Sequence, residues 1–246
     1  MTDTTATLLY ALAFATIAWG GWLWRSRRIA PLEWALISAS ALATLASVQL
    51  LDLNLVLKPM PMAIAMIFVA TRAIATGGIG RNDALLLAAL LFSLGGDVFL
   101  MLPGDYFIPG LASFLVAHLF YIALFRQGAP WFASRSGLAA VLAFGLGMYA
   151  ILWSHLPNPV LGAAVCAYVT VISLMASQAI GRAKSLGTAD ARWVAVGTCI
   201  FMASDSLIAV NKFLVPIPLA SLWILVTYFA AQFLIVHFMA GRTQYA

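Results

Sequence analysis

Two aspartates stand inside long apolar stretches of this sequence, where a charged side chain is costly. Asp97 occurs in the segment SLGGDVFLML, and Asp205 occurs in MASDSLIAVNK. An ionised carboxylate near the centre of a bilayer costs roughly 2.5 to 3.5 kcal/mol, so each aspartate predicts a functional site. Two carboxyl groups in one apolar site can act as general acid and general base, because burial and mutual repulsion keep one of them protonated. Such a pair can also bind or relay a cation.

Two pairs of polar residues occur at helical spacing in other apolar stretches. His118 and Tyr121 are three positions apart, and Tyr228 and Gln232 are four positions apart. Residues at these spacings share one face of a helix. Each of these residues also has a plain structural explanation, as an interfacial tyrosine or as one partner of a hydrogen bond between helices.

Three more polar residues fall near the same level. Asn211 and Lys212 come six and seven positions after Asp205 and return roughly to its helix face after two turns. Lys58 precedes Pro59 in another apolar stretch. A lysine at such a position can simply extend its charged end to the membrane surface.

The composition indicates that these residues belong to a membrane protein. Hydrophobic residues make up 64% of the 246 positions and charged residues 9%, with a mean hydropathy of +1.01. An ordinary soluble domain has roughly 25% charged residues. The length is therefore better divided into membrane spans of roughly 20 residues each. The net charge of +5 does not indicate nucleic-acid binding, because the basic residues lie between apolar runs rather than in one patch.

The apolar runs predict an all-α bundle of about nine transmembrane helices. The expected spans are Thr7 to Trp24, Glu33 to Leu51, Leu55 to Ile74, Asp83 to Leu102, Ile108 to Phe125, Gly137 to Trp153, Pro159 to Ile180, Ala191 to Val210 and Ile217 to Met239. Lys58, Pro59 and Pro61 interrupt the third run, so eight spans are the alternative.

The two cysteines give no sign of a disulfide or a metal site. Cys166 and Cys199 lie in apolar runs without metal-ligand spacing, and we expect both to be small buried residues. The sequence has no nucleotide-binding loop, metal-ligand cluster or serine-hydrolase elbow, so we expect no organic cofactor and no required metal.

The basic residues predict the orientation of the chain, because short cytoplasmic loops are enriched in Lys and Arg. The side that holds the loops after spans one, three, five and seven, and the C-terminal tail, carries Arg25, Arg27, Arg28, Arg72, Arg81, Arg126, Arg135, Arg182, Lys184, Arg192 and Arg242. The other side carries Lys58 and Lys212. We therefore expect the N-terminus outside and the C-terminus in the cytoplasm, in a multi-pass protein of a bacterial inner membrane.

This topology brings the two aspartates to one depth. The fourth and eighth spans both run outward, and each aspartate comes five to seven residues before the outer end of its span. At a rise of 1.5 Å per residue, both carboxyl groups lie roughly 7 to 11 Å below the outer boundary. Small neighbours such as Gly96 and Ser204 allow adjacent helices to approach closely. We therefore expect the two carboxyl groups to share a cavity.

The order of these motifs resembles the YhhN-like family of integral membrane proteins, whose characterised animal members are lysoplasmalogenases. The resemblance covers roughly Lys58 to Val236. Its pieces are Lys58-Pro59, Gly96-Asp97, Leu100 to Leu102, Gly110-Leu111, Phe114, Ala117-His118, Tyr121, Ser204 to Ser206, Asn211 to Phe213 and Tyr228 to Gln232. No single piece is specific, but their order and spacing together are.

The sequence departs from the family pattern at its beginning. Family members commonly have eight spans, with the Lys-Pro pair after the first, whereas here a further apolar segment precedes that span. We therefore divide the chain into residues 1–30, an extra N-terminal transmembrane helix with a basic loop, and residues 31–246, an eight-helix membrane domain.

The resemblance implies hydrolysis of the vinyl ether bond of a lysoplasmalogen to a fatty aldehyde and a glycerophospho-base. The lipid substrate would enter from the membrane. Asp97 and Asp205 would be the catalytic acid and base, in an order that the sequence does not decide. The substrate-binding residues would orient water or glycerol hydroxyls or attract the phosphate: they are Lys58, His118, Tyr121, Asn211, Lys212, Tyr228 and Gln232.

Two other functions remain open from the sequence. In a proton-coupled or small-solute transporter, the two aspartates would bind and relay a cation during alternating access. No convincing inverted repeat supports this alternative. In a non-catalytic lipid-binding protein, the polar residues would only hold helices together. The sequence does not predict the oligomeric state.

Overall fold

The chain is a bundle of helices. The computed structural model describes residues 3–48 and 53–240, and every regular element in these ranges is a helix. The elements are α1 (Asp3–Arg25), α2 (Pro31–Ser47), α3 (Asn54–Leu57), α4 (Met60–Ala75), α5 (Arg81–Met101), α6 (Phe107–Phe125), α7 (Arg135–Trp153), α8 (Pro159–Leu186), α9 (Ala189–Phe213) and α10 (Ala220–Ala240). Within these ranges, eight segments are long and apolar enough to cross a membrane when α3 and α4 are counted as one. The structure therefore confirms the predicted polytopic bundle, in which α2, with 17 residues, is a further and slightly shorter helix.

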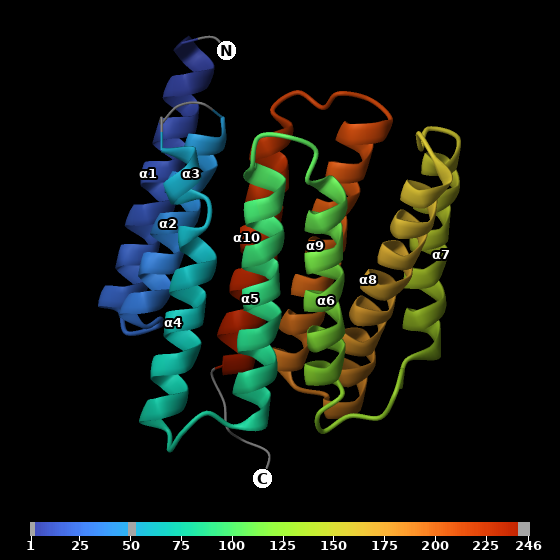
Figure 1. Cartoon of the computed structure of the whole chain (residues 1–246). Coiled ribbons are helices and arrows are strands. Elements are labelled where there is room, and N and C mark those ends of the chain that lie inside the picture. Colours follow the sequence, from blue (N-terminus) through green and yellow to red (C-terminus); the bar gives the residue numbers. More distant parts are fainter. Residues whose placement is uncertain (1–2, 49–52, 241–246) are drawn as a thin grey trace.

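Successive long helices run in opposite directions (Figure 1). The helices α1, α2 and α4 form one side of the bundle, α7 and α8 form the other, and α5, α6, α9 and α10 lie between them. Lys58 and Lys212 line one cavity, which lies toward one end of the bundle, whereas the loops that carry most of the basic residues lie at the opposite end. The division of the chain at residue 30 stays a prediction.

Prolines and capping side chains set several helix ends. Pro31 and Pro159 stand in the first turns of α2 and α8, where a missing N–H breaks no helical hydrogen bond. The side chain of Asn158 accepts a hydrogen bond from the Leu161 N–H at 2.9 Å. Gly187 ends α8 in the left-handed conformation, with a φ of 66°. Glycine adopts this conformation without steric cost.

The predicted third span is a helix with a break at Lys58 and Pro59. The short helix α3 ends just before this pair and α4 begins just after it. Proline lacks the N–H that a continuous helix needs, so the helical hydrogen bonding is interrupted at Pro59. Lys58 and Pro59 themselves keep helical backbone angles. The break places Lys58 in the wall of a cavity.

The predicted end of the seventh span at Ile180 is wrong. Helix α8 continues to Leu186, so Arg182 and Lys184 lie on its last two turns rather than in a loop. Long basic side chains can reach the membrane surface from within a helix, so the first arginine after an apolar run does not have to end it.

The last span begins later than predicted. Helix α10 begins at Ala220 rather than at Ile217. The Ile217 N–H donates a hydrogen bond to Oδ1 of Asn211 at 2.9 Å, which holds this residue in the connection after α9. The predicted end of the second span at Leu51 lies outside the described residues.

The two cysteines are exposed, contrary to expectation. Cys166 on α8 and Cys199 on α9 are free thiols on the outside of the bundle. In a membrane bundle the positions that face lipid are as apolar as those that face the core. An apolar run therefore does not show which of its residues are buried.

The main core lies between α4, α5, α6, α8, α9 and α10. Its fully buried members include Met62, Leu90, Phe125, Met175 and Phe201. The peripheral helix α1 contacts α2 through a separate cluster of Leu9, Ala13 and Leu45. The core therefore holds together the same helices that carry the two aspartates.

The contact between α5 and α6 depends on a glycine next to Asp97. A Cβ atom at Gly96 would overlap the ring of Phe114, which packs directly on the α5 backbone. A Cβ atom at Gly147 on α7 would meet nothing within 4 Å. The two glycines therefore provide a matched pair for testing this packing.

We expect Gly96→Ala to destabilise the protein by about 1 to 3 kcal/mol, because the added methyl group overpacks the contact with Phe114. Gly147→Ala should leave stability unchanged or raise it slightly, because alanine favours helices. The measurement is the thermal unfolding of each variant in mild detergent. Equal unfolding temperatures for the two variants would contradict the predicted role of Gly96.

Candidate functional site

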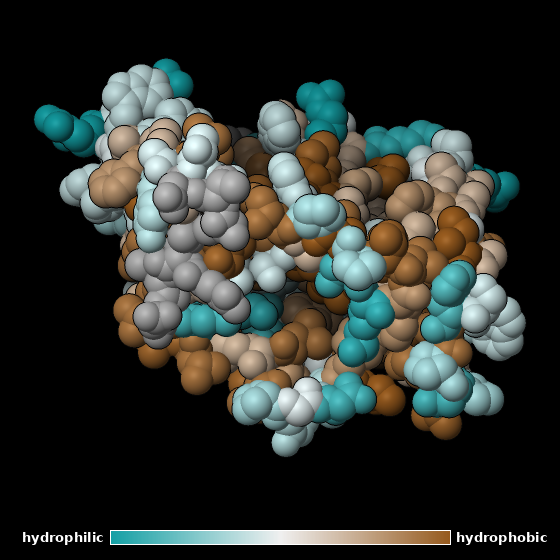
Figure 2. Space-filling model, turned by 90° about the horizontal axis from the view of Figure 1, so that it is seen from above, coloured by the Kyte–Doolittle hydropathy of each residue, from teal (hydrophilic) through white to brown (hydrophobic). Residues whose placement is uncertain are grey.

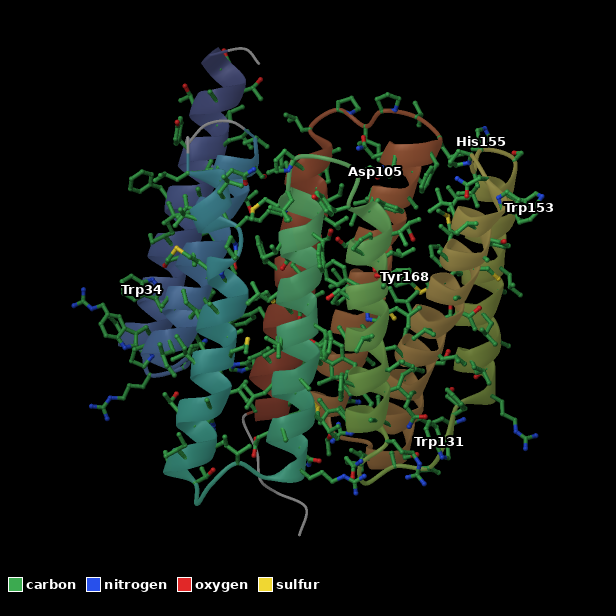
Figure 3. The ribbon with its side chains drawn as sticks, in the orientation of Figure 1. Trp34, Asp105, Trp131, Trp153, His155 and Tyr168 are labelled. Carbon is green, nitrogen blue, oxygen red and sulfur yellow. The ribbon has the colours of Figure 1, made fainter. Side chains whose placement is uncertain are left out.

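A polar cavity opens at the end of the bundle that carries Lys58. It has a volume of about 480 Å³ and lies between α5, α9, α10 and the break before α4. Both Asp97 and Asp205 line it, as we expected from their common depth. Figure 2 views this end of the molecule and shows a recess with hydrophilic residues beside it. Asp105, in the loop between α5 and α6, is at the rim (Figure 3).

A chain of hydrogen bonds leads from Asp97 into the core. Asp97 is 5% exposed, and its Oδ2 accepts a hydrogen bond of 2.8 Å from the Tyr228 hydroxyl. The amide group of Gln232 donates to the Tyr228 oxygen at 3.5 Å and to Ser93 at 3.3 Å. Its carbonyl oxygen accepts from the Tyr121 hydroxyl at 2.6 Å. These bonds fix Asp97 on α5 against α10 and α6.

A second network holds Asp205. The Tyr168 hydroxyl on α8 donates a hydrogen bond to Oδ2 of Asp205. The Nε2 atom of His118 lies 3.0 Å from this hydroxyl oxygen and 3.7 Å from the same carboxylate oxygen. Nε2 is the donor or the acceptor of the His118–Tyr168 bond according to the tautomer of the imidazole. Figure 3 shows Tyr168 in the middle of the bundle, on the inner side of α8.

Aromatic rings lie between the two networks. Phe201 packs edge-on against both His118, at 5.0 Å between ring centroids, and Tyr228, at 5.4 Å. Phe114 packs edge-on against Phe201 and Tyr228 as well. The side chains that hold the two aspartates are therefore fixed by packing as well as by hydrogen bonds.

An apolar cleft meets the polar cavity at Asp205. The cleft lies between α6, α7, α8 and α9 and has a volume of about 60 Å³. Its lining includes Leu111, Phe144, Met148, Val165, Met202 and Ala209. Asp205 borders both spaces, whereas Asp97 borders only the polar cavity. The site therefore has a wide polar part and a narrow apolar part, which meet at Asp205.

The cationic side chains lie at the polar end of the site. Lys58 and Lys212 both line the polar cavity, as does Asp97. The Lys212 ammonium group lies 4.6 Å from the centroid of the Phe107 ring, a cation–π contact. Asn211 also lines the cavity, with its Oδ1 engaged by the loop after α9.

The structure separates the residues that the sequence singled out into two layers. Those that line the polar cavity are Lys58, Asp97, Asp205, Asn211, Lys212 and Tyr228. His118, Tyr121 and Gln232 are fully buried and lie behind the residues that line the cavity. Tyr121 and Gln232 are connected to Asp97 through the Tyr228 hydroxyl, and His118 is connected to Asp205 through the Tyr168 hydroxyl. Their roles in binding or catalysis stay predictions.

The sequence analysis missed Tyr168, Ser93 and Asp105. Tyr168 is the only tyrosine in α8, and a hydroxyl group in an apolar run is the one signal that points to it. Asp105 falls in a loop, where solvation alone explains an aspartate. Within residues 3–48 and 53–240, no group of three His, Cys, Asp or Glu side chains is placed to hold a metal ion.

Comparisons with known proteins agree on one family. The model of the YhhN family matches residues 53–239, which include every residue of both networks. The chain is 36% identical to a lysoplasmalogenase of Mycobacterium tuberculosis over 174 residues, covering 67% of this chain and 64% of that protein. The chain thus matches slightly less than two thirds of the length of that relative.

Two animal proteins are similarly related. The lysoplasmalogenase TMEM86A of Homo sapiens is 36% identical over 61% of this chain and 62% of its own length. The lysoplasmalogenase TMEM86B of Sus scrofa is 36% identical over 72% of this chain and 71% of its own length. No solved structure matches the chain. On the family match and these identities, the chain belongs to the YhhN family.

Proposed function

We propose that this chain is a membrane hydrolase that cleaves the vinyl ether bond of a lysoplasmalogen, a lysoplasmenyl-ethanolamine or -choline. The observation that carries the proposal is the meeting of a polar cavity and an apolar cleft at Asp205. In a lysoplasmalogen the vinyl ether joins the polar glycerophosphate part to the hydrocarbon chain. The names of the related lysoplasmalogenases support the same activity.

The proposed binding mode follows the polarity of the two spaces. The phosphate would lie in the polar cavity near Lys58 and Lys212, whose charges complement it. The alkenyl chain would lie in the apolar cleft, which borders α7. Among the long helices, α7 is one of the least buried and packs mainly on α8 and α9, so a slight outward movement would widen the narrow cleft for a chain entering from lipid.

The chemistry requires a proton donor near the β-carbon of the vinyl ether and an anion near its α-carbon. A carboxylic acid gives its proton to the β-carbon of the alkenyl group, which leaves an oxocarbenium ion at the α-carbon. Water adds to the α-carbon and gives up a proton to a base, and the hemiacetal then collapses to an aldehyde and a free glycerol hydroxyl. Glycosidases use two carboxyl groups for a related oxocarbenium ion.

The position of each aspartate supports an assignment of these roles. The β-carbon belongs to the hydrocarbon side of the bond, so its proton donor should border the apolar cleft. Asp205 does so and is assigned as the acid. Asp97 faces only the polar cavity, the side from which water would reach the bond, so it is assigned as the anion and base. Tyr168 and His118 would then position Asp205.

The proposed orientation keeps the polar cavity on the outer side of a bacterial inner membrane. The loops at the opposite end carry most of the basic residues, which favours the cytoplasm for that end. The N-terminus would then be outside and the C-terminus inside.

Asp97→Asn and Asp205→Asn should each lower turnover at least about 100-fold, because each removes one acid–base group. The assay supplies lysoplasmenyl-ethanolamine to purified protein in mild detergent and follows aldehyde release with a coupled alcohol dehydrogenase. Asp83→Asn is the matched control, because Asp83 lies on α5 as well but caps its first turn through the Gly80 N–H at 3.0 Å. Near-normal turnover by either site variant would exclude that aspartate from the reaction.

Tyr168→Phe should lower kcat about 10- to 100-fold and leave KM nearly unchanged, because it removes a hydrogen bond to a carboxyl group that acts in the chemical step. Tyr149→Phe on α7 is the control, since its hydroxyl donates to the Gly162 carbonyl at 3.1 Å and the residue lines neither the polar cavity nor the apolar cleft. If the kcat of Tyr168→Phe matched that of the control, Tyr168 would not position the acid.

Ala209→Phe should raise KM for long-chain lysoplasmalogens more than for short-chain ones, because the ring would fill part of the apolar cleft. Ala203→Phe changes the same helix on its exposed side, and it should alter neither the KM for long-chain substrates nor the KM for short-chain ones. The measurement compares KM for substrates with alkenyl chains of different lengths. An effect of Ala209→Phe that was independent of chain length would argue against the cleft as the chain site.

A further inference from the structure

A second polar cavity lies at the opposite end of the bundle from the proposed active site. It has a volume of about 580 Å³ and is formed by the turn between α1 and α2, together with α4, α9 and α10. Three arginines line it: Arg27 and Arg28 from the turn, and Arg72 from the last turn of α4. The proposed reaction does not use this cavity.

The turn between α1 and α2 holds its two arginines in a defined conformation. The Arg27 N–H donates to the Trp24 carbonyl and the Arg28 N–H to the Leu23 carbonyl, both at 2.9 Å. Arg27 has a φ of 56°, in the left-handed region that favours glycine at the end of a helix. The turn therefore keeps an arginine at a position where glycine would be less strained.

The carboxylates around this cavity already have partners in the protein. Glu33 is 3% exposed, accepts a hydrogen bond of 2.6 Å from the Ala30 N–H and pairs with His237. Asp190 lies in the first turn of α9, where the helix dipole stabilises its charge, and it too has an interaction partner. Arg72 has an interaction partner as well. The exposed Arg27 and Arg28 thus supply the charge available to a ligand.

An aromatic groove continues from this cavity along the outside of α1. It has a volume of about 600 Å³ and is lined by Gly21, Trp22, Trp24, Arg25 and Trp34, among others. Trp24 borders both the groove and the arginine cavity, and its ring stacks on Trp34 at 5.1 Å between centroids. Figure 3 labels Trp34 on this side of the bundle. Tryptophans are typical of the membrane interface, where lipid head groups meet acyl chains.

We propose that this end of the bundle binds one anionic phospholipid, with its phosphate on Arg27 and Arg28 and an acyl chain along the tryptophan groove. Arginine binds phosphate through two parallel hydrogen bonds, and basic pockets between transmembrane helices are typical sites for anionic head groups. The turn and α1 precede residue 53, where the family match begins, whereas α4 and α10 lie within it. The lipid would join these two parts of the chain.

The test measures lipid binding by native mass spectrometry of the purified protein in an uncharged detergent. We expect one phosphatidylglycerol to bind tightly, and phosphatidylcholine to bind at least about tenfold more weakly because its head group has no net charge. Arg27→Gln combined with Arg28→Gln should weaken phosphatidylglycerol binding about tenfold or more. Arg135→Gln should leave it unchanged, because Arg135 is exposed at the start of α7, outside the cavity.

Other arms of the experiment separate charge from fold and lipid from free phosphate. Arg28→Lys keeps the positive charge and should bind phosphatidylglycerol more tightly than the double variant does. Without added lipid, the double variant should unfold at the same temperature as the wild type, which shows that its fold is intact. Equal binding of both lipids, or equal binding by the double variant and the wild type, would overturn the proposal. Displacement of phosphatidylglycerol by inorganic phosphate at the same concentration would also overturn it, in favour of a free phosphate site.

Discussion

The cost of burying two carboxyl groups among apolar helices determines how the centre of this bundle is built. A buried carboxylate without partners is strongly destabilising, so each aspartate requires hydrogen-bond donors from neighbouring helices. Tyr228 on α10 supplies the donor for Asp97, and Tyr168 on α8 supplies it for Asp205. The two hydrogen bonds thus fix α10 against α5 and α8 against α9.

Asp205 lies at the boundary between a polar space and an apolar space inside the bundle. The polar cavity holds the charged side chains and reaches the surface, whereas the apolar cleft extends between helices that face lipid. An amphipathic molecule lowers its free energy when its polar part lies in the polar cavity and its apolar part lies in the apolar cleft. This preference orients the molecule in the site before any specific hydrogen bond forms. The two environments therefore suit the proposed lipid substrate independently of the names of the relatives.

The sequence predicted the helices and much of the polar wall, because burial costs and helix breakers act locally. Asp97, Asp205 and Lys58 were recognised as charges in apolar surroundings, and they do line one cavity. The partners behind them were harder to predict. The lipid-facing and buried faces of a membrane helix are equally apolar, so the pattern could not show that Tyr168 points inward or that Cys199 points outward.

The hydrogen bonds that hold the two aspartates also fix how the helices pack against one another. Gln232 contacts Tyr121 on α6 and Ser93 on α5, so one α10 side chain fixes the relative position of three helices. A shift of one helix by a single residue would break several of these bonds together and leave buried polar groups without partners. In a bundle whose apolar surfaces are nearly interchangeable, such bonds distinguish the correct packing from its alternatives. The residues proposed to position the aspartates therefore also specify which helices lie side by side.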